Sequence, residues 1–345
     1  MAHELPDAGT ARAEGSAELA HGGDIERVAV VGAGLIGSRW AALLIANGLN
    51  VTVADPAPNA EERVIADVER CLPAIARLAA DSSSPSDSTP GSRSHRGNLS
   101  FVTQIEDATS EADFIQESVA DDEQLKLEVL QRIDRASRSH AVIASSTSGI
   151  LPTLLQSACR RPERLLVGHP FNPVHIIPLV EVVPGRQTAQ HVVERAVAFY
   201  TRLGKRPLLV KRETPGFVAN RLQEAVWREM FHLVNDKIVT TKELDASVTD
   251  GPGLRWALLG PAFVYLMQGG SGGMAYAMDQ FDPERISDWA HCKYPTITST
   301  LKGMLDEQTR EQADGRSLEE WEELRDEFLL RVIEIKRELF SVAGS

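Results

Sequence analysis

Residues 27–55 read RVAVVGAGLIGSRWAALLIANGLNVTVAD and decide the fold of this chain. An apolar run at 28–31 leads into Gly32-x-Gly34-x-x-Gly37, and a helix-compatible segment follows. A second apolar run at 51–54 then ends at Asp55. Strand, glycine turn, helix and strand in this order are typical of the segment that binds a dinucleotide in doubly wound sheets.

The glycine turn and Asp55 predict NAD as the cofactor. The three glycines allow a tight turn, a close approach of the pyrophosphate and close packing of the helix, in that order. The free N–H groups at the helix start favour an anion. Asp55 is placed to accept hydrogen bonds from a ribose diol and to repel a 2′-phosphate, which favours NAD over NADP. A structural strand–helix turn is the alternative. The predicted cofactor contacts here are Gly32, Ala33, Gly34, Leu35, Ile36, Gly37 and Asp55.

The composition is that of an ordinary globular chain. Its 345 residues have room for two domains, and 43% are hydrophobic and 25% charged. A formal net charge of −13 argues against nucleic acid and anionic membranes as partners. No apolar stretch is long enough to span a membrane, and three scattered cysteines offer neither a disulfide framework nor a metal site. We expect a cytoplasmic protein without a metal.

Strand-like and helix-like segments alternate up to residue 210. Further strands are expected at 99–103, 114–118, 141–145, 165–168, 179–183 and 207–210. Further helices are expected at 60–80, 123–136, 151–159 and 189–203. This alternation predicts an α/β fold with a doubly wound, mainly parallel Rossmann sheet. Beyond it, apolar residues recur at helical spacing, which predicts an all-helical C-terminal domain. Examples are 217–236, 241–248 and 318–340.

Three regions are therefore expected. Residues 1–25 carry no secretion signal and are predicted to be a disordered tail. Residues 26–210 form the NAD-binding domain, interrupted by a flexible loop at 81–97 that is rich in Ser, Pro and Gly. Residues 211–345 form the helical domain, to which we assign substrate binding and dimerisation.

A second group of polar residues follows the later strands. Ser148 ends the sequence SSTS after the strand at 141–145, and His169 directly follows the strand at 165–168. Doubly wound folds bind ligands at this carboxyl edge of the sheet. Histidine suits proton transfer near neutral pH. Glu181, on a returning strand, is placed to fix the tautomer of that ring and to favour its charged form. A structural histidine satisfied by the backbone is the alternative.

Three segments resemble motifs of the 3-hydroxyacyl-CoA dehydrogenase superfamily: GHPFNPV at 168–174, PLVEVV at 178–183 and TPGFVANRL at 214–222. The similarity runs from residue 27 into the C-terminal helices. It implies an NAD-dependent dehydrogenase in which His169 and Glu181 form the catalytic pair. The resemblance also implies that Ser148 and Asn220 hold and polarise the substrate oxygen.

The same resemblance places the ribose contacts on the nicotinamide side at Asp121 and Lys126. Simpler alternatives exist for several of these residues. Ser148 suits the cap of a helix beginning near residue 151, Asn220 suits a hydrogen-bonded core position, and Lys126 suits a solvated helix face. One departure is plain, because the acyl-CoA enzymes usually have Asn where Ser146 stands.

The substrate is expected to be a small 3-hydroxy acid. Residues 71–97 carry only scattered arginines and a histidine, which gives little support for binding the phosphates of CoA. The segments GLRWA at 253–257, GGSGGM at 269–274 and QFDP at 280–283 look most like the L-carnitine 3-dehydrogenase branch. That likeness implies oxidation of L-carnitine to 3-dehydrocarnitine. The branch has D-x-F-x-x-D-R where this chain keeps PGFVANR, so L-gulonate (the branch of lambda-crystallin) and short-chain 3-hydroxyacyl-CoA stay open as substrates.

The helical domain supplies the predicted substrate contacts, Arg255 and Trp256. A guanidinium binds a carboxylate bidentately, and an aromatic face binds a quaternary ammonium. A surface or interface ion pair is the alternative for Arg255, and core packing is the alternative for Trp256 and the other aromatics. We also expect a homodimer, formed through apolar surface of this domain. A redox-silent NAD-binding structural protein is the non-enzyme alternative, against which the intact set of polar residues argues.

Overall fold

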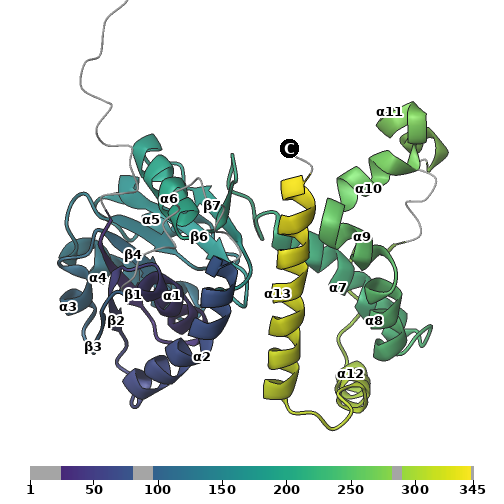
Figure 1. The fold of residues 1–345 in the computed structure, drawn as a ribbon, viewed down its shortest axis with the longest axis horizontal. Helices are drawn as coiled ribbons and strands as arrows, with labels where there is room; N and C mark the ends of the chain where they lie inside the picture. The colour runs from purple at the N-terminus through teal and green to yellow at the C-terminus, as the bar shows by residue number, and fades with distance from the viewer. Residues whose placement is uncertain (1–24, 81–95, 282–289, 343–345) are drawn as a thin grey trace, which may run out of the picture. The chain divides into compact units, whose positions relative to one another are not determined.

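The computed structural model describes residues 25–80, 96–281 and 290–342, with side-chain burial up to residue 339. Apart from Ile25 and residues 96 and 97, the predicted tail and the predicted loop lie outside these ranges. The chain divides into two compact units between Phe217 and Val218 (Figure 1). This point comes after the boundary expected near residue 211, because Phe217 is fully buried with Val210 in the core of the first unit.

The first unit contains an eight-stranded sheet in the order β3-β2-β1-β4-β5-β6-β7-β8. Its strands are β1 (Arg27–Val31), β2 (Asn50–Ala54), β3 (Leu99–Val102), β4 (Phe114–Glu117), β5 (Val142–Ser145), β6 (Leu165–Pro170), β7 (Leu179–Pro184) and β8 (Arg206–Leu209). Every pairing is parallel except that of β6 with β7. The predicted doubly wound, mainly parallel sheet is therefore confirmed.

Helices pack on both faces of this sheet. They are α1 (Leu35–Ala46), α2 (Ala60–Ala80), α3 (Ile105–Thr109), α4 (Glu123–Ala136), α5 (Pro152–Gln156) and α6 (Gln190–Arg202). Alternate residues of β1 point into two separate cores, because Val30 shares one with Trp40 of α1 and Val31 shares the other with Leu130 of α4. Burial on both sides explains why the strands read as continuous apolar runs.

Two elements differ from the prediction in ways that matter for the site. The helix expected at 151–159 is only α5, because the chain turns after Gln156 toward a 3₁₀ helix at Pro162–Arg164. The strand expected at 165–168 extends to Pro170, because β7 pairs with it beyond Gly168. His169 therefore lies inside β6, opposite Glu181 in the register of the antiparallel pair.

The second unit is helical, as predicted. Its helices are α7 (Ala219–Asn235), α8 (Thr241–Thr249), α9 (Pro252–Leu259), α10 (Pro261–Gln268), α11 (Gly273–Gln280), α12 (Ser299–Gln312) and α13 (Leu318–Val342), with a 3₁₀ helix at Gly270–Gly272. A capping box of Thr240 and Glu243 begins α8. The short helices α9 to α11, bounded by Gly and Pro, were not predicted separately, since helical periodicity needs a longer window.

Candidate active site

The glycine turn joins β1 to α1 and is shaped to receive a pyrophosphate. Gly32 has a φ of +100°, and a Cβ there would lie 2.7 Å from the carbonyl of Ser118. A Cβ at Gly37 would lie 1.9 Å from the carbonyl oxygen of Gly32. At Gly34, which is exposed, a Cβ would meet nothing within 4 Å. The turn is thus closed on the protein side and open at the position where an anion reaches the helix N-terminus.

Asp55 follows β2 beside this turn. Its carboxylate accepts hydrogen bonds from the backbone N–H of Ala33 at 2.7 Å and from that of Ala57 at 2.8 Å. A carboxylate has about four acceptor positions, so two of them remain for a ribose diol. The first contact ties the acid to the glycine turn. Both features therefore belong to one preformed surface that fits an adenosine diphosphate.

His169 and Glu181 lie opposite each other on β6 and β7. The imidazole Nδ1 is 2.8 Å from Oε2 of Glu181, and the pair is deeply buried, with side chains 7% and 0% exposed. The rings of Phe171 and Phe217 pack at 4.8 Å and 5.6 Å from the imidazole centroid. Glu181 thus holds one ring nitrogen in a dry setting and leaves Nε2 as the nitrogen for proton exchange.

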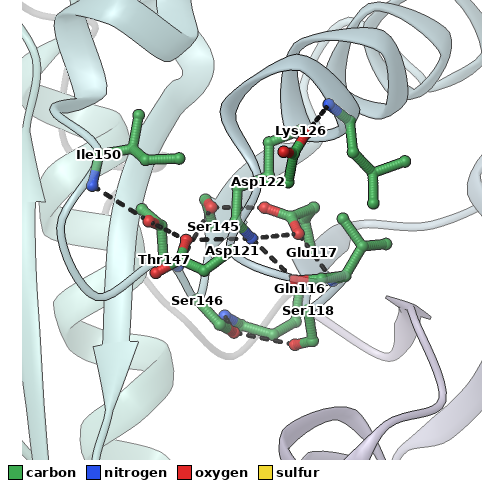
Figure 2. Close-up of polar contacts among 12 residues, drawn as sticks. Gln116, Glu117, Ser118, Asp121, Asp122, Lys126, Ser145, Ser146, Thr147 and Ile150 are labelled. Atoms are coloured by element: carbon green, nitrogen blue, oxygen red, sulfur yellow. Dashed lines mark hydrogen bonds and ion pairs between the residues drawn. The ribbon is translucent and has the colours of Figure 1, made fainter. Parts of the chain in front are cut away.

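Ser148 and Asp121 meet at the carboxyl edge of the sheet. Ser148 donates to Asp121 through its hydroxyl at 2.6 Å and through its backbone N–H at 3.0 Å. Thr147 donates to the same carboxylate at 2.5 Å (Figure 2). The alternative that Ser148 caps the next helix is wrong, because the N-cap residue of α5 is Leu151 and Ser148 is engaged elsewhere.

Asp121 is an anion at neutral pH. Burial acts to raise its pKa, but the hydrogen bonds from Ser148 and Thr147 and the charge on Lys126 outweigh burial, so the pKa lies below its ordinary value. The nearest cation is Lys126, whose Nζ is 3.9 Å from an Asp121 oxygen.

Lys126 does not lie on a solvated helix face, so that alternative is wrong. Its side chain is 1% exposed, and its Nζ donates to Oε1 of Glu117 at 2.8 Å and to the carbonyl of Val119 at 3.1 Å. Glu117, itself fully buried at the end of β4, also accepts from the Val119 N–H at 2.8 Å and from the Ser145 hydroxyl (Figure 2). This acid therefore links β4, β5 and the start of α4.

The sequence reasoning missed Glu117. The resemblance assigned Asp121 and Lys126 but not Glu117, which lies just before them at the end of β4. The available signal was a carboxylate at the end of an apolar strand, where a buried charge requires a cation. Lys126, nine positions later, is that cation.

A neutral network lies beside this acid. Gln116 on β4 accepts a hydrogen bond from the buried hydroxyl of Tyr200 at 2.7 Å and donates to the Ser146 hydroxyl at 2.8 Å. The hydroxyls of Ser146 and Ser118 are 2.8 Å apart. Ser146, which differs from the Asn of the acyl-CoA enzymes, is therefore part of the internal hydrogen bonding between strands at the edge of the sheet.

Three predicted site residues belong to the second unit and are described there alone. Asn220 lies in the first turn of α7 and is partly buried. Arg255 and Trp256 lie on α9 and are both exposed, Trp256 by 40%. Core packing, the alternative for the aromatic residues of this domain, does not hold for five of them, which are exposed: Trp227, Trp256, Phe263, Tyr276 and Phe281.

The described residues contain neither a group suited to a metal ion nor a helix suited to a membrane. Within residues 25–80, 96–281 and 290–342, no cluster of three or more His, Cys, Asp or Glu side chains is arranged to hold a metal ion. No helix within the same ranges has the length and apolar character needed to cross a membrane.

Family models match both units of the chain. The model described as 3-hydroxyacyl-CoA dehydrogenase, NAD binding domain, matches residues 27–214. The model of the C-terminal domain of the same enzymes matches residues 216–309. Among solved structures, a 5-formyl-3-hydroxy-2-methylpyridine 4-carboxylic acid 5-dehydrogenase, described as an NAD⁺-dependent dismutase, is 28% identical with a TM-score of 0.76. The match covers 91% of this chain and 99% of that one.

Three relatives with more similar sequences are L-carnitine dehydrogenases. An L-carnitine dehydrogenase from Oceanobacillus iheyensis is 43% identical over 90% of this chain and 98% of its own length. Another from Burkholderia mallei is 45% identical over 90% and 93%, and one from Pseudomonas aeruginosa is 44% identical over 91% and 95%. The resemblance found in the sequence is confirmed: this chain belongs to the 3-hydroxyacyl-CoA dehydrogenase family and is an NAD-dependent dehydrogenase.

Proposed function

We propose that this protein oxidises the 3-hydroxyl of L-carnitine to give 3-dehydrocarnitine. The observation that carries the proposal is the buried pair of His169 and Glu181, joined at 2.8 Å between Nδ1 and Oε2. The choice of substrate rests on the relatives, which are named L-carnitine dehydrogenases at 41–45% identity.

The reaction needs a base for the hydroxyl proton, and His169 supplies it through Nε2. Glu181 accepts the hydrogen bond from Nδ1–H, which fixes the tautomer with Nε2 unprotonated and then stabilises the imidazolium. Bound NAD supplies the hydride acceptor. Ser148 donates its hydroxyl proton to Asp121, and its oxygen can still accept a hydrogen bond from the substrate hydroxyl. The family resemblance assigns contact with the substrate oxygen to Asn220 as well.

NAD has residues of fitting chemistry in the first unit. The backbone N–H groups at the start of α1 take the pyrophosphate, and Asp55 takes the adenosine ribose with its two remaining acceptor positions. The segment 32–37 forms this surface through Gly32, Ala33, Gly34, Leu35, Ile36 and Gly37. The family resemblance assigns the second ribose to Asp121 and Lys126. Asp121 is partly exposed and held as an anion by Ser148 and Thr147, so it can accept hydrogen bonds from the ribose, and the buried Lys126 supports it by its charge.

L-Carnitine has a negative carboxylate at one end and a positive trimethylammonium at the other. Helix α9 carries a side chain suited to each. The guanidinium of Arg255 suits the carboxylate, and the indole face of Trp256 suits the trimethylammonium, which can form no hydrogen bond. Both side chains are exposed and accessible to a ligand.

A substrate screen tests the proposal. Purified protein is incubated with NAD and L-carnitine, L-gulonate or (S)-3-hydroxybutyryl-CoA, and NADH formation is followed at 340 nm. We expect kcat/KM for L-carnitine to exceed that for the other two by at least about 100-fold, as for sites that recognise a charged group. Preference for either of the others rejects L-carnitine as substrate. NADH binding without turnover of any of them supports a redox-silent protein.

We also infer a homodimer that works in the cytoplasm. Large apolar side chains are exposed along α13, among them Leu324, Phe328, Ile335 and Leu339, each about half exposed or more. Such a surface favours burial against a partner. The three cysteines are free thiols, which suits a reducing compartment. Light scattering of the full chain measures the oligomeric state, and a monomer would remove the dimer from the proposal.

A further inference from the structure

The loop between β6 and β7, residues 171–178, carries the chain from His169 to Glu181. Phe171 begins this loop and packs its ring 4.8 Å from the imidazole of His169. Val174 is fully buried and Ile176 nearly so. The position of this loop therefore sets one wall of the space around the imidazole.

Lys205 reaches the inner side of this loop from another part of the chain. The residue lies between α6 and β8, and its side chain is buried. Its Nζ donates to the carbonyl of Ile177 at 2.8 Å and also to the carbonyl of Val174. One ammonium thus serves two loop carbonyls, that of the buried Val174 and that of the partly buried Ile177.

The same ammonium lies next to the helix that follows the glycine turn. Its Nζ is 5.4 Å from the ring centroid of Trp40 on α1, and the neighbouring Arg39 donates to the side chain of Asn172 in the loop. The loop after His169 is therefore connected to the dinucleotide-binding helix at two points. Lys205 lies between the two elements and contacts both.

A lysine at this position is costly, which argues that its contacts are needed. Within the described parts of the chain, no carboxylate forms an ion pair with Lys205. The surrounding elements do carry titratable side chains, among them Arg39 on α1, His175 in the loop and Tyr200 on α6. Burial without a counter-charge lowers the pKa of Lys205 to about 7. An apolar residue would avoid this cost but could not hold the two carbonyls.

We propose that Lys205 is a positioning residue for the reaction: it holds the 171–178 loop against α1 and so aligns His169 with the bound dinucleotide. This inference rests on the proposed dehydrogenase reaction at His169. The effect acts through Phe171 and the β6–β7 connection, since Lys205 itself contacts neither the imidazole nor the carboxylate of the pair.

The test compares Lys205→Met, which keeps the length and removes the donor, with Lys211→Met at an exposed position on the same unit. Three quantities are measured on the full chain: amide hydrogen exchange of peptides covering 171–178, the dissociation constant of NADH, and kcat per NADH-binding site. We expect about tenfold faster exchange of the loop and a kcat about 10- to 100-fold lower, the size of effect that a 1 Å misplacement causes. NADH affinity should change by less than about threefold.

Loop exchange and kcat that match those of Lys211→Met would overturn the proposal. A lowered melting temperature with unchanged kcat per NADH site would overturn it too, because that pattern means a structural role alone. If Lys205→Met does not fold, Lys205→Gln, which keeps one donor group, takes its place and should give an intermediate loop exchange and kcat. If the wild type oxidises no hydroxy acid, the proposed function fails, while the exchange measurement still decides whether Lys205 holds the loop.

Discussion

Globular proteins usually expose charged side chains and bury apolar ones. Each unit of this chain departs from one half of that rule. The first unit buries charged groups in pairs, such as Glu117 with Lys126 and Asp134 with Arg164. The second unit instead exposes large apolar side chains, such as Phe263 and Phe328. Buried charges are costly and persist where geometry matters, whereas exposed apolar surface persists where a ligand or partner covers it. This contrast supports the proposal that the first unit carries the chemistry and the second binds the substrate and a partner subunit.

The largest effect is expected at the centre of the first unit. Replacing His169 by Ala removes the base, so kcat should fall by about 10²- to 10⁴-fold, with NAD affinity nearly unchanged. Stopped-flow or steady-state NADH formation measures the first quantity, and NADH fluorescence titration measures the second. Loss of dinucleotide binding in this variant would mean that the imidazole is architectural.

The next effect concerns the buried pair of Glu117 and Lys126. Glu117→Gln leaves a buried ammonium without its counter-charge, so the free energy of unfolding should fall by about 3–5 kcal/mol. The matched control is Glu111→Gln, because Glu111 is 65% exposed and its ion pairs with Arg27 and Arg138 lie at the surface. That control should cost less than about 1 kcal/mol. Urea unfolding measures the free energy of unfolding of both variants. Equal losses in the two would contradict the distinction between buried and exposed ion pairs.

The third effect is a pH dependence of stability from Lys205. Its folded pKa is about 7, below its ordinary value of 10.5, so the unfolded chain binds more protons between these two pH values. The free energy of unfolding should therefore rise with pH in that window, by up to about 1.4 kcal/mol per pH unit. Urea titrations of Lys205→Met against wild type from pH 7 to 10 isolate this contribution. A difference between the two that stays constant with pH would contradict it.

The smallest effect is expected in the second unit. Trp256→Ala should raise KM for L-carnitine by about 2- to 30-fold, the worth of one cation–π contact, and leave kcat nearly unchanged. Trp321→Ala on α13, also an exposed tryptophan, is the control and should not alter KM. A fall in kcat for Trp256→Ala would contradict the proposal that the second unit contributes to substrate binding and not to the chemical step.

The sequence by itself determined that the first unit contains a doubly wound, mainly parallel sheet, and it named His169 and Glu181 as candidate site residues. Continuous apolar runs, a glycine turn followed by an acid, and polar residues after strands predict a doubly wound sheet, because each pattern has a local physical cause. Both His169 and Glu181 could be named for the same reason, since each stands in or directly after such a run. Helix ends and the short helices of the second unit were less predictable, because tertiary contacts decide them.

Only the tertiary structure decided how the expected pair of His169 and Glu181 is aligned and which other polar groups meet. The opposition of His169 and Glu181 depends on the register of β6 with β7, the counter-charge of Lys126 is Glu117 on β4, and Lys205 binds a loop some thirty positions earlier in the chain. None of these pairs has a sequence spacing that marks it. The strength of each contact comes from burial, and burial is a property of the packed fold rather than of any segment alone.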